Sequence, residues 1–136
     1  MTAAAPPLLR TELALLAHAA WVVLPATLAA GAWALFRFVR RDGLPTARYL
    51  HAFLVVAVWL VVAGFYDLAT HHPAAVGGPP WTLDAGAGAL LAQSGVGLAL
   101  RHTRPARTRT ARLLAWHLVL ALATTAGVLV GLWPYR

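Results

Sequence analysis

The 136-residue sequence contains no cysteine, no lysine, one methionine and only four acidic residues. The absence of cysteine excludes disulfides, thiolate metal sites, iron–sulfur clusters and cysteine nucleophiles. Charged residues make up 11% of the chain, whereas about a quarter is usual for a water-soluble domain. With 60% hydrophobic residues and a mean hydropathy of +0.69, the composition excludes an ordinary soluble domain and indicates a membrane protein.

Four apolar stretches are long enough, or nearly so, for a membrane-spanning helix, which needs about 20 mostly apolar residues. They cover residues 13–38, 49–69, 83–100 and 113–133. The first continues to a group of arginines, which is the reverse of the charge order in a cleaved signal peptide. It also contains Pro25, which removes a helical hydrogen bond and is expected to bend the helix.

The third stretch is the shortest and the richest in small residues. Its small side chains recur at helical spacing and are expected to let it pack closely inside the bundle: Ala85, Gly88, Ala92 and Gly95. The sequence therefore predicts an all-α, polytopic membrane protein in which residues 1–136 form one domain, an antiparallel bundle of four transmembrane helices. The two halves share the order helix, basic connection, helix, but without an internal repeat of convincing identity.

The eleven arginines are distributed very unevenly. Nine of them lie within residues 37–48 and 101–112, and the Gly- and Pro-rich connection at 70–82 has none. Under the positive-inside rule, both arginine-rich connections face the cytoplasm, and both termini and the 70–82 loop lie outside. The basic charge is thus explained by multi-pass insertion in the cell membrane and by lipid headgroups, so no nucleic-acid partner is predicted.

Histidine is the strong ligand that remains inside a bundle without cysteine. His51 follows Arg48 by three residues and His117 follows Arg112 by five, which places the two imidazoles within about 3 Å of one depth. Two histidines at one level on different helices suit bis-imidazole ligation of haem b, with Arg48 and Arg112 available for the propionates. His102 is a third candidate ligand. The alternative is that these are interfacial histidines that reach water or headgroups.

A second group of polar residues is predicted in the outer half: His18, Asp67, His71 and His72. Asp67 and His71 are four residues apart and share a helix face, where a carboxylate can orient an imidazole. The group is a candidate metal site, with copper as the alternative cofactor, or a proton or quinone site. The simpler interpretation is that His71 and His72 are solvated and Asp67 pairs locally.

Gln93 and Thr124 are polar residues at mid-membrane positions of the third and fourth stretches. Such groups mostly form hydrogen bonds between helices. A small transporter would instead use Gln93 together with His18 and Asp67.

The pattern resembles the small b-type membrane cytochromes, in which a four-helix bundle holds haem between histidines on facing helices. The segments that carry the resemblance are RYLHAFLVVAVWL, which contains His51, and RLLAWHLVLALATTAGVLVG, which contains His117. The family's two-haem members have paired histidines about fourteen residues apart on shared helices. This chain lacks that spacing, so the resemblance implies a one-haem protein that exchanges electrons with quinone or another partner.

Two fainter similarities point to copper. The run AGVLVGLWPY is similar to four-helix membrane proteins that assist haem–copper oxidase maturation, and LLAHAAWVVLPATLAAGAWAL looks like the histidine-bearing helices of copper-uptake proteins. The leading hypothesis is electron transfer through haem b held between the second and fourth helices. The alternatives are a non-enzymatic accessory or assembly subunit of a respiratory or copper-handling membrane complex, and a small transporter.

Overall fold

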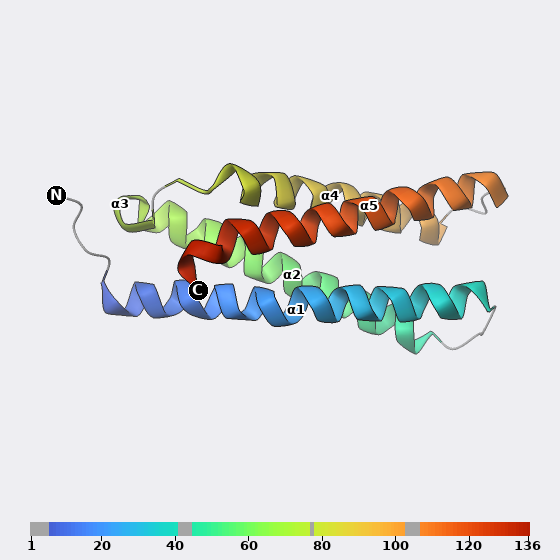
Figure 1. Ribbon diagram of the computed structural model, residues 1–136, viewed down its shortest axis with the longest axis horizontal. Helices are drawn as coiled ribbons and strands as arrows, with labels where there is room; N and C mark the ends of the chain where they lie inside the picture. The colour runs from blue at the N-terminus through green and yellow to red at the C-terminus, as the bar shows by residue number, and fades with distance from the viewer. Residues whose placement is uncertain (1–5, 41–44, 77, 103–106) are drawn as a thin grey trace. The chain divides into compact units, whose positions relative to one another are not determined.

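The computed structural model describes residues 6–40, 45–76, 78–102 and 107–136 (Figure 1). The helices are α1 (Pro7–Val39), α2 (Thr46–His71), α3 (Pro73–Val76), α4 (Trp81–His102) and α5 (Arg107–Leu132), followed by a short 3-10 helix, η1 (Trp133–Tyr135). No strand occurs within these ranges. The prediction of an all-α chain is therefore confirmed.

The four long helices are apolar and long enough to cross a membrane, as the composition predicted. Each helix begins a few residues before the apolar stretch from which it was predicted. The first, α1, starts at Pro7, so its first turns include Arg10 and Glu12. Helical hydrogen bonds need no apolar side chain, and proline is favoured in the first turn because its missing N–H would have no partner there. At the other end, α1 runs through Pro25 to Val39 as one helix of 33 residues.

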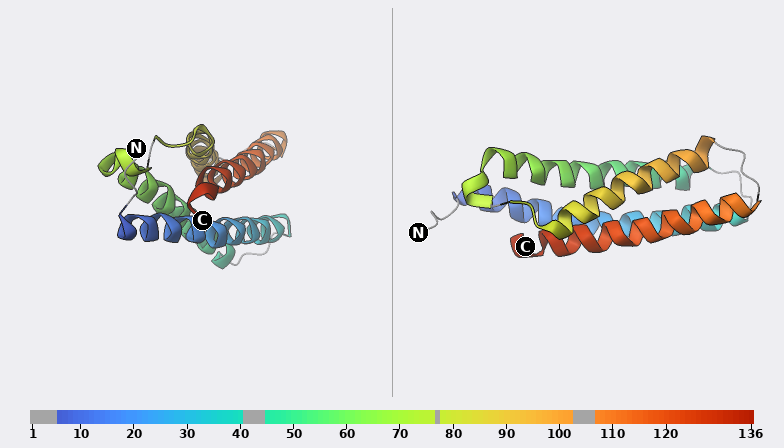
Figure 2. Two further views of the ribbon diagram at one scale, coloured as in Figure 1. Left: turned by 60° about the vertical axis from the view of Figure 1, so that its left-hand side comes forward. Right: turned by 90° about the horizontal axis from the view of Figure 1, so that it is seen from above.

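The described chain divides into two compact units, each built on one helix hairpin. The first unit extends to Pro79 and includes Leu132–Arg136, and the second comprises Pro80–Gly131. Within the first unit α1 and α2 run in opposite directions, and within the second α4 and α5 do the same (Figure 2). Each hairpin thus has one end at an arginine-rich connection.

The apolar core of the first unit lies along the seam of α1 and α2. Ala17 and Leu24 are buried on α1, and Val58, Val62 and Phe65 are buried on α2. The members of each set recur every three, four or seven residues, which places them on one helix face. The second unit buries Leu83 and Leu90 of α4 and Val128 of α5 in the same manner.

The second hairpin is held by a close approach of two helix backbones. A Cβ added at Gly127 would lie 2.6 Å from Gly86 Cα, and one added at Gly131 would lie 2.7 Å from Leu83 Cβ. The small-residue face predicted for the third stretch is not the face of α4 that packs on α5: Ala85, Gly88, Ala92 and Gly95 are exposed. Against α5, α4 buries the face with Leu83, Gly86 and Leu90, because Gly86 lets the two backbones approach closely.

A hydrogen bond links the two helices of this hairpin farther along. The hydroxyl of Thr124 donates to Gln93 Oε1 over 3.3 Å, and both side chains are buried. The prediction that these mid-membrane polar residues bond between helices is confirmed.

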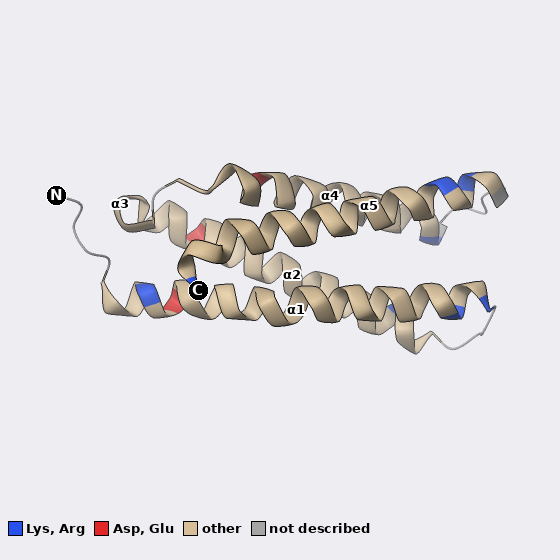
Figure 3. Cartoon of the chain, in the orientation of Figure 1, with Lys and Arg blue, Asp and Glu red and all other residues tan. Residues whose placement is uncertain are grey.

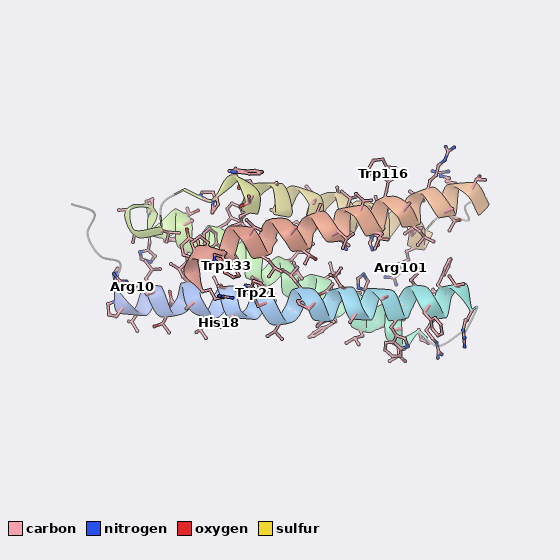
Figure 4. The ribbon with its side chains drawn as sticks, viewed as in Figure 1. Arg10, His18, Trp21, Arg101, Trp116 and Trp133 are labelled. Carbon is pink, nitrogen blue, oxygen red and sulfur yellow. The ribbon has the colours of Figure 1, made fainter. Side chains whose placement is uncertain are left out.

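The end of the chain packs on the first hairpin. The Trp133 ring lies 5.6 Å from that of Trp21, and the Tyr135 ring lies 5.1 Å from that of Phe65. The Tyr135 hydroxyl donates to the Val76 carbonyl over 3.2 Å. Trp21 and Trp133 can be followed in Figure 4. These aromatic contacts attach the end of the chain to both helices of the first hairpin.

Most of the described arginines lie beside the two connections within the hairpins (Figure 3). In the second hairpin the described arginines of α4 and α5 gather beside the 103–106 connection, and Asp84 lies in the first turn of α4 at the opposite end. In the first hairpin Arg37, Arg40 and Arg48 flank the 41–44 connection. Each hairpin thus has a basic end and an apolar middle, and the first hairpin also carries Arg10 at its other end.

Candidate histidine sites

His51 lies in the second turn of α2 and is half-buried against α1. Its Nδ1–H donates to the backbone carbonyl of Thr27 over 3.1 Å. A Cβ added at Gly31, one turn farther along α1, would lie 3.0 Å from Cε1 of the imidazole. The ring therefore packs on α1, where it donates a hydrogen bond to Thr27 and lies against Gly31, which has no side chain.

His117 has a similar place in the second hairpin. It is half-buried on α5, with its Nδ1 shielded from solvent. A Cβ added at Gly97 of α4 would lie 3.3 Å from Cε1 of the His117 ring. His117 thus also packs its imidazole against a glycine of the neighbouring helix, and it belongs to the second unit whereas His51 belongs to the first.

The other residues predicted for this site are near the arginine-rich connections. Arg48 is exposed, and its guanidinium carbon lies 5.8 Å from the centroid of the Phe38 ring. Arg112 is exposed on α5, where it borders a shallow hollow of about 200 Å³ lined also by Trp116 and Val119. His102 is the last residue of α4, and its side chain lies outside the described part of the structure.

The outer group of polar residues forms only local contacts. His71 Nδ1 lies 3.3 Å from Asp67 Oδ1, which confirms the predicted pairing on one helix face, but the two side chains are 68% and 70% exposed. His18 is exposed and donates from Nδ1 to the Ala14 carbonyl of its own helix. His72 caps α2 through its backbone N–H. In the described ranges, no three His, Asp or Glu side chains gather to hold a metal ion.

No protein-family model, curated protein or solved structure matches this chain. Its function must therefore be argued from the four apolar helices and from the way each histidine is held. On that basis His51 and His117 are distinguished from the exposed histidines, since each packs against the other helix of its hairpin.

The sequence interpretation missed the two glycines and the Thr27 carbonyl. A backbone acceptor has no side-chain signature, so Thr27 could not have been identified without the crossing of α1 and α2. The glycines did carry a signal: in each half a glycine precedes the histidine by twenty residues, from Gly31 to His51 and from Gly97 to His117. The cluster formed by Trp21, Trp133 and Arg136 was also missed, because its members come from opposite ends of the chain.

Proposed function

We propose that this chain is a multi-pass membrane protein that transfers electrons through haem b, which the imidazoles of His51 and His117 would hold. The observation that carries the proposal is the hydrogen bond from His51 Nδ1–H to the Thr27 carbonyl. A carbonyl oxygen can only accept, so Nδ1 carries the proton and Nε2 of the neutral ring carries the lone pair. Histidines that ligate metals nearly always donate their other N–H in this way.

The donor chemistry of the chain fits haem better than a metal held by side chains alone. Haem iron needs one or two imidazoles, since the porphyrin supplies the remaining four ligands. A bare metal ion would need three or four protein ligands, and the described residues offer no such group. Arg48 and Arg112 are exposed near the arginine-rich ends, where guanidinium groups can pair with the propionates.

Haem, when bound, supplies a one-electron redox couple. The protein's contributions are those of its own groups. Thr27 holds the His51 ring in one tautomer and orientation, and the half-buried positions of both histidines limit their access to water. The apolar helices around them lower the local dielectric, which strengthens the electrostatic effect of nearby charges on a bound cofactor.

We further propose that the two hairpins form an antiparallel four-helix bundle in the cell membrane. The arginine-rich connections at 37–48 and 101–112 would face the cytoplasm, and both termini and the 70–82 loop would lie outside. The concentration of nine of the eleven arginines at these two connections supports this orientation. Quinone or another membrane-complex subunit is the electron partner that this placement suits.

The test is the optical spectrum of the full-length protein, purified in detergent after expression with added haem precursor. We expect a Soret band that shifts on reduction, with about one haem per chain. His51→Ala and His117→Ala should each abolish most of this absorbance, because each removes one ligand. His72→Ala, at an exposed position directly after the helix that carries His51, is the control and should keep the wild-type spectrum.

Loss of a ligand can be separated from loss of the fold by adding imidazole to the His51→Gly variant. Free imidazole fits the space vacated by the side chain and should restore the spectrum if His51 binds iron. A colourless wild-type protein after haem supplementation would refute the proposal. A spectrum unchanged in both alanine variants would show that other groups hold the haem.

A further inference from the structure

Each position that the described part of the second hairpin buries has a buried counterpart in the first hairpin. In the second unit the buried residues of α4 are Leu83, Gly86, Leu90 and Gln93, and those of α5 up to Gly131 are Thr124, Val128 and Gly131. The residues 66 positions earlier are buried in the first unit without exception: Ala17, Ala20, Leu24, Thr27, Val58, Val62 and Phe65. Side-chain identity is mostly different, so the correspondence is one of position and packing.

The contacts between glycine and histidine follow the same offset. Gly97 lies 66 residues after Gly31, and His117 lies 66 residues after His51. In each hairpin the imidazole of the second helix lies against the glycine of the first. A shared helical period could align buried faces by itself, but it would not place the same glycine and the same histidine in contact in both hairpins. The two hairpins therefore share both their buried positions and their contact between glycine and histidine.

Glycine favours this contact by leaving room for the ring. A Cβ at position 31 would stand 3.0 Å from Cε1 and 3.2 Å from Nδ1 of His51, closer than such non-bonded atoms normally approach. The ring would have to shift by a few tenths of an ångström, which moves Nδ1 relative to the Thr27 carbonyl that accepts its hydrogen bond. At position 97 a Cβ would stand 3.3 Å from Cε1 of His117.

We propose that the two hairpins are repeats of one structural unit and that Gly31 and Gly97 are its positioning residues, each setting the orientation of one imidazole ligand. The ligand role rests on the proposed function, whereas the positioning of the rings does not. In this arrangement each repeat presents one histidine, which gives a chain with two repeats the two imidazoles that bis-histidine ligation needs.

The decisive variants are Gly31→Ala and Gly97→Ala in the full-length protein. Alanine favours a helix more than glycine does, so any loss of haem binding would not come from weaker helix formation. We expect each variant to raise the dissociation constant for haem by about 10- to 100-fold, as changes to groups that orient a ligand do. The electron paramagnetic resonance g values of the oxidised haem should change as well, because they report the orientation of the imidazole planes.

Gly95→Ala is the matched control, since it lies on the same helix as Gly97 and no described heavy atom lies within 4 Å of a Cβ built there. It should bind haem within about twofold of wild type, the scatter usual for surface changes that touch nothing. Haem binding and g values in Gly31→Ala and Gly97→Ala that match those of Gly95→Ala would overturn the positioning role and leave the proposed function intact.

A second readout needs no haem. With ¹⁵N-labelled histidine, the His51 ring should show the Nδ1–H tautomer, and the signal is assigned by its loss in His51→Ala. We expect Gly31→Ala to shift this signal and Gly95→Ala to leave it unchanged. If the wild type binds no haem, the proposed function fails, and these shifts alone decide the positioning role: an unshifted His51 signal in Gly31→Ala would refute it.

Discussion

At the scale of single residues, the histidines of this chain differ in which helix receives their hydrogen bond. His18 and His71 donate from Nδ1 to carbonyls four residues earlier in their own helices. His51 donates to Thr27, which is 24 residues away on the neighbouring helix. A local bond forms in any helix of suitable sequence, whereas the bond of His51 exists only after α1 and α2 pack. Its geometry is therefore tied to the tertiary fold, as a cofactor ligand requires.

The bond between Thr124 and Gln93 allows a prediction at the same scale. Thr124→Val preserves shape but removes the hydroxyl that donates to Gln93 Oε1. We expect it to lower the free energy of unfolding in mixed detergent micelles by about 0.6 kcal/mol, the average for hydrogen bonds between membrane helices. Thr125→Val is the control, because Thr125 bonds only within α5, to the Ala121 carbonyl. An equal loss in both variants would contradict a specific bond between the helices.

At the scale of helices, the second hairpin depends on glycines that the small-residue stripe of α4 did not reveal. Gly86 and Gly127 bring the backbones of α4 and α5 together, and Gly131 makes room for Leu83. Two stripes on α4 offered small residues, and only the one that also carries Leu83 and Leu90 is buried. The exposed stripe also carries Leu91 and Leu98, so large side chains alone do not select the buried face; that face contains Gly86, which lets the backbone of α5 approach closely.

Gly127→Ala should disrupt this hairpin more than a substitution on the exposed stripe. The new Cβ would lie 2.6 Å from Gly86 Cα and 2.7 Å from the Thr82 carbonyl oxygen, so one backbone must move. Overpacking of this kind costs about 1–3 kcal/mol of unfolding free energy. Gly88→Ala, with no described atom within 4 Å of its Cβ, should be neutral or slightly stabilising in the same denaturation assay. A stable Gly127→Ala protein would show that the helices are farther apart.

At the scale of the whole molecule, the charge pattern makes orientation testable. The chain has no cysteine, so single cysteines can be introduced without a background. We expect a cysteine at Thr46, beside an arginine-rich connection, to react with a membrane-impermeant thiol reagent only after the cell membrane is opened. A cysteine at Gly78 should react in intact cells. Reaction of both sites in intact cells would contradict the proposed orientation.

Most of the secondary structure could be predicted from hydropathy, because each apolar stretch is long and its limits are marked by arginine or proline. Helix ends were less predictable, as α1 shows by beginning at Pro7 rather than at residue 13. Of the candidate site residues, Asp67 and His71 pair as their spacing predicted, since a contact four residues apart is local. The packing of the His51 and His117 rings could not be predicted in this way, because it depends on glycines of another helix.

The sequence by itself determined that this is a chain of four apolar helices with nine of its eleven arginines at two connections, because hydropathy and charge act along the chain and need no partner. Only the tertiary structure decided which face of each helix is buried, that the two hairpins share one packing plan, and that Thr27 and Gly31 hold the His51 ring. Those features arise where two helix surfaces meet, and their shape depends on both surfaces at once.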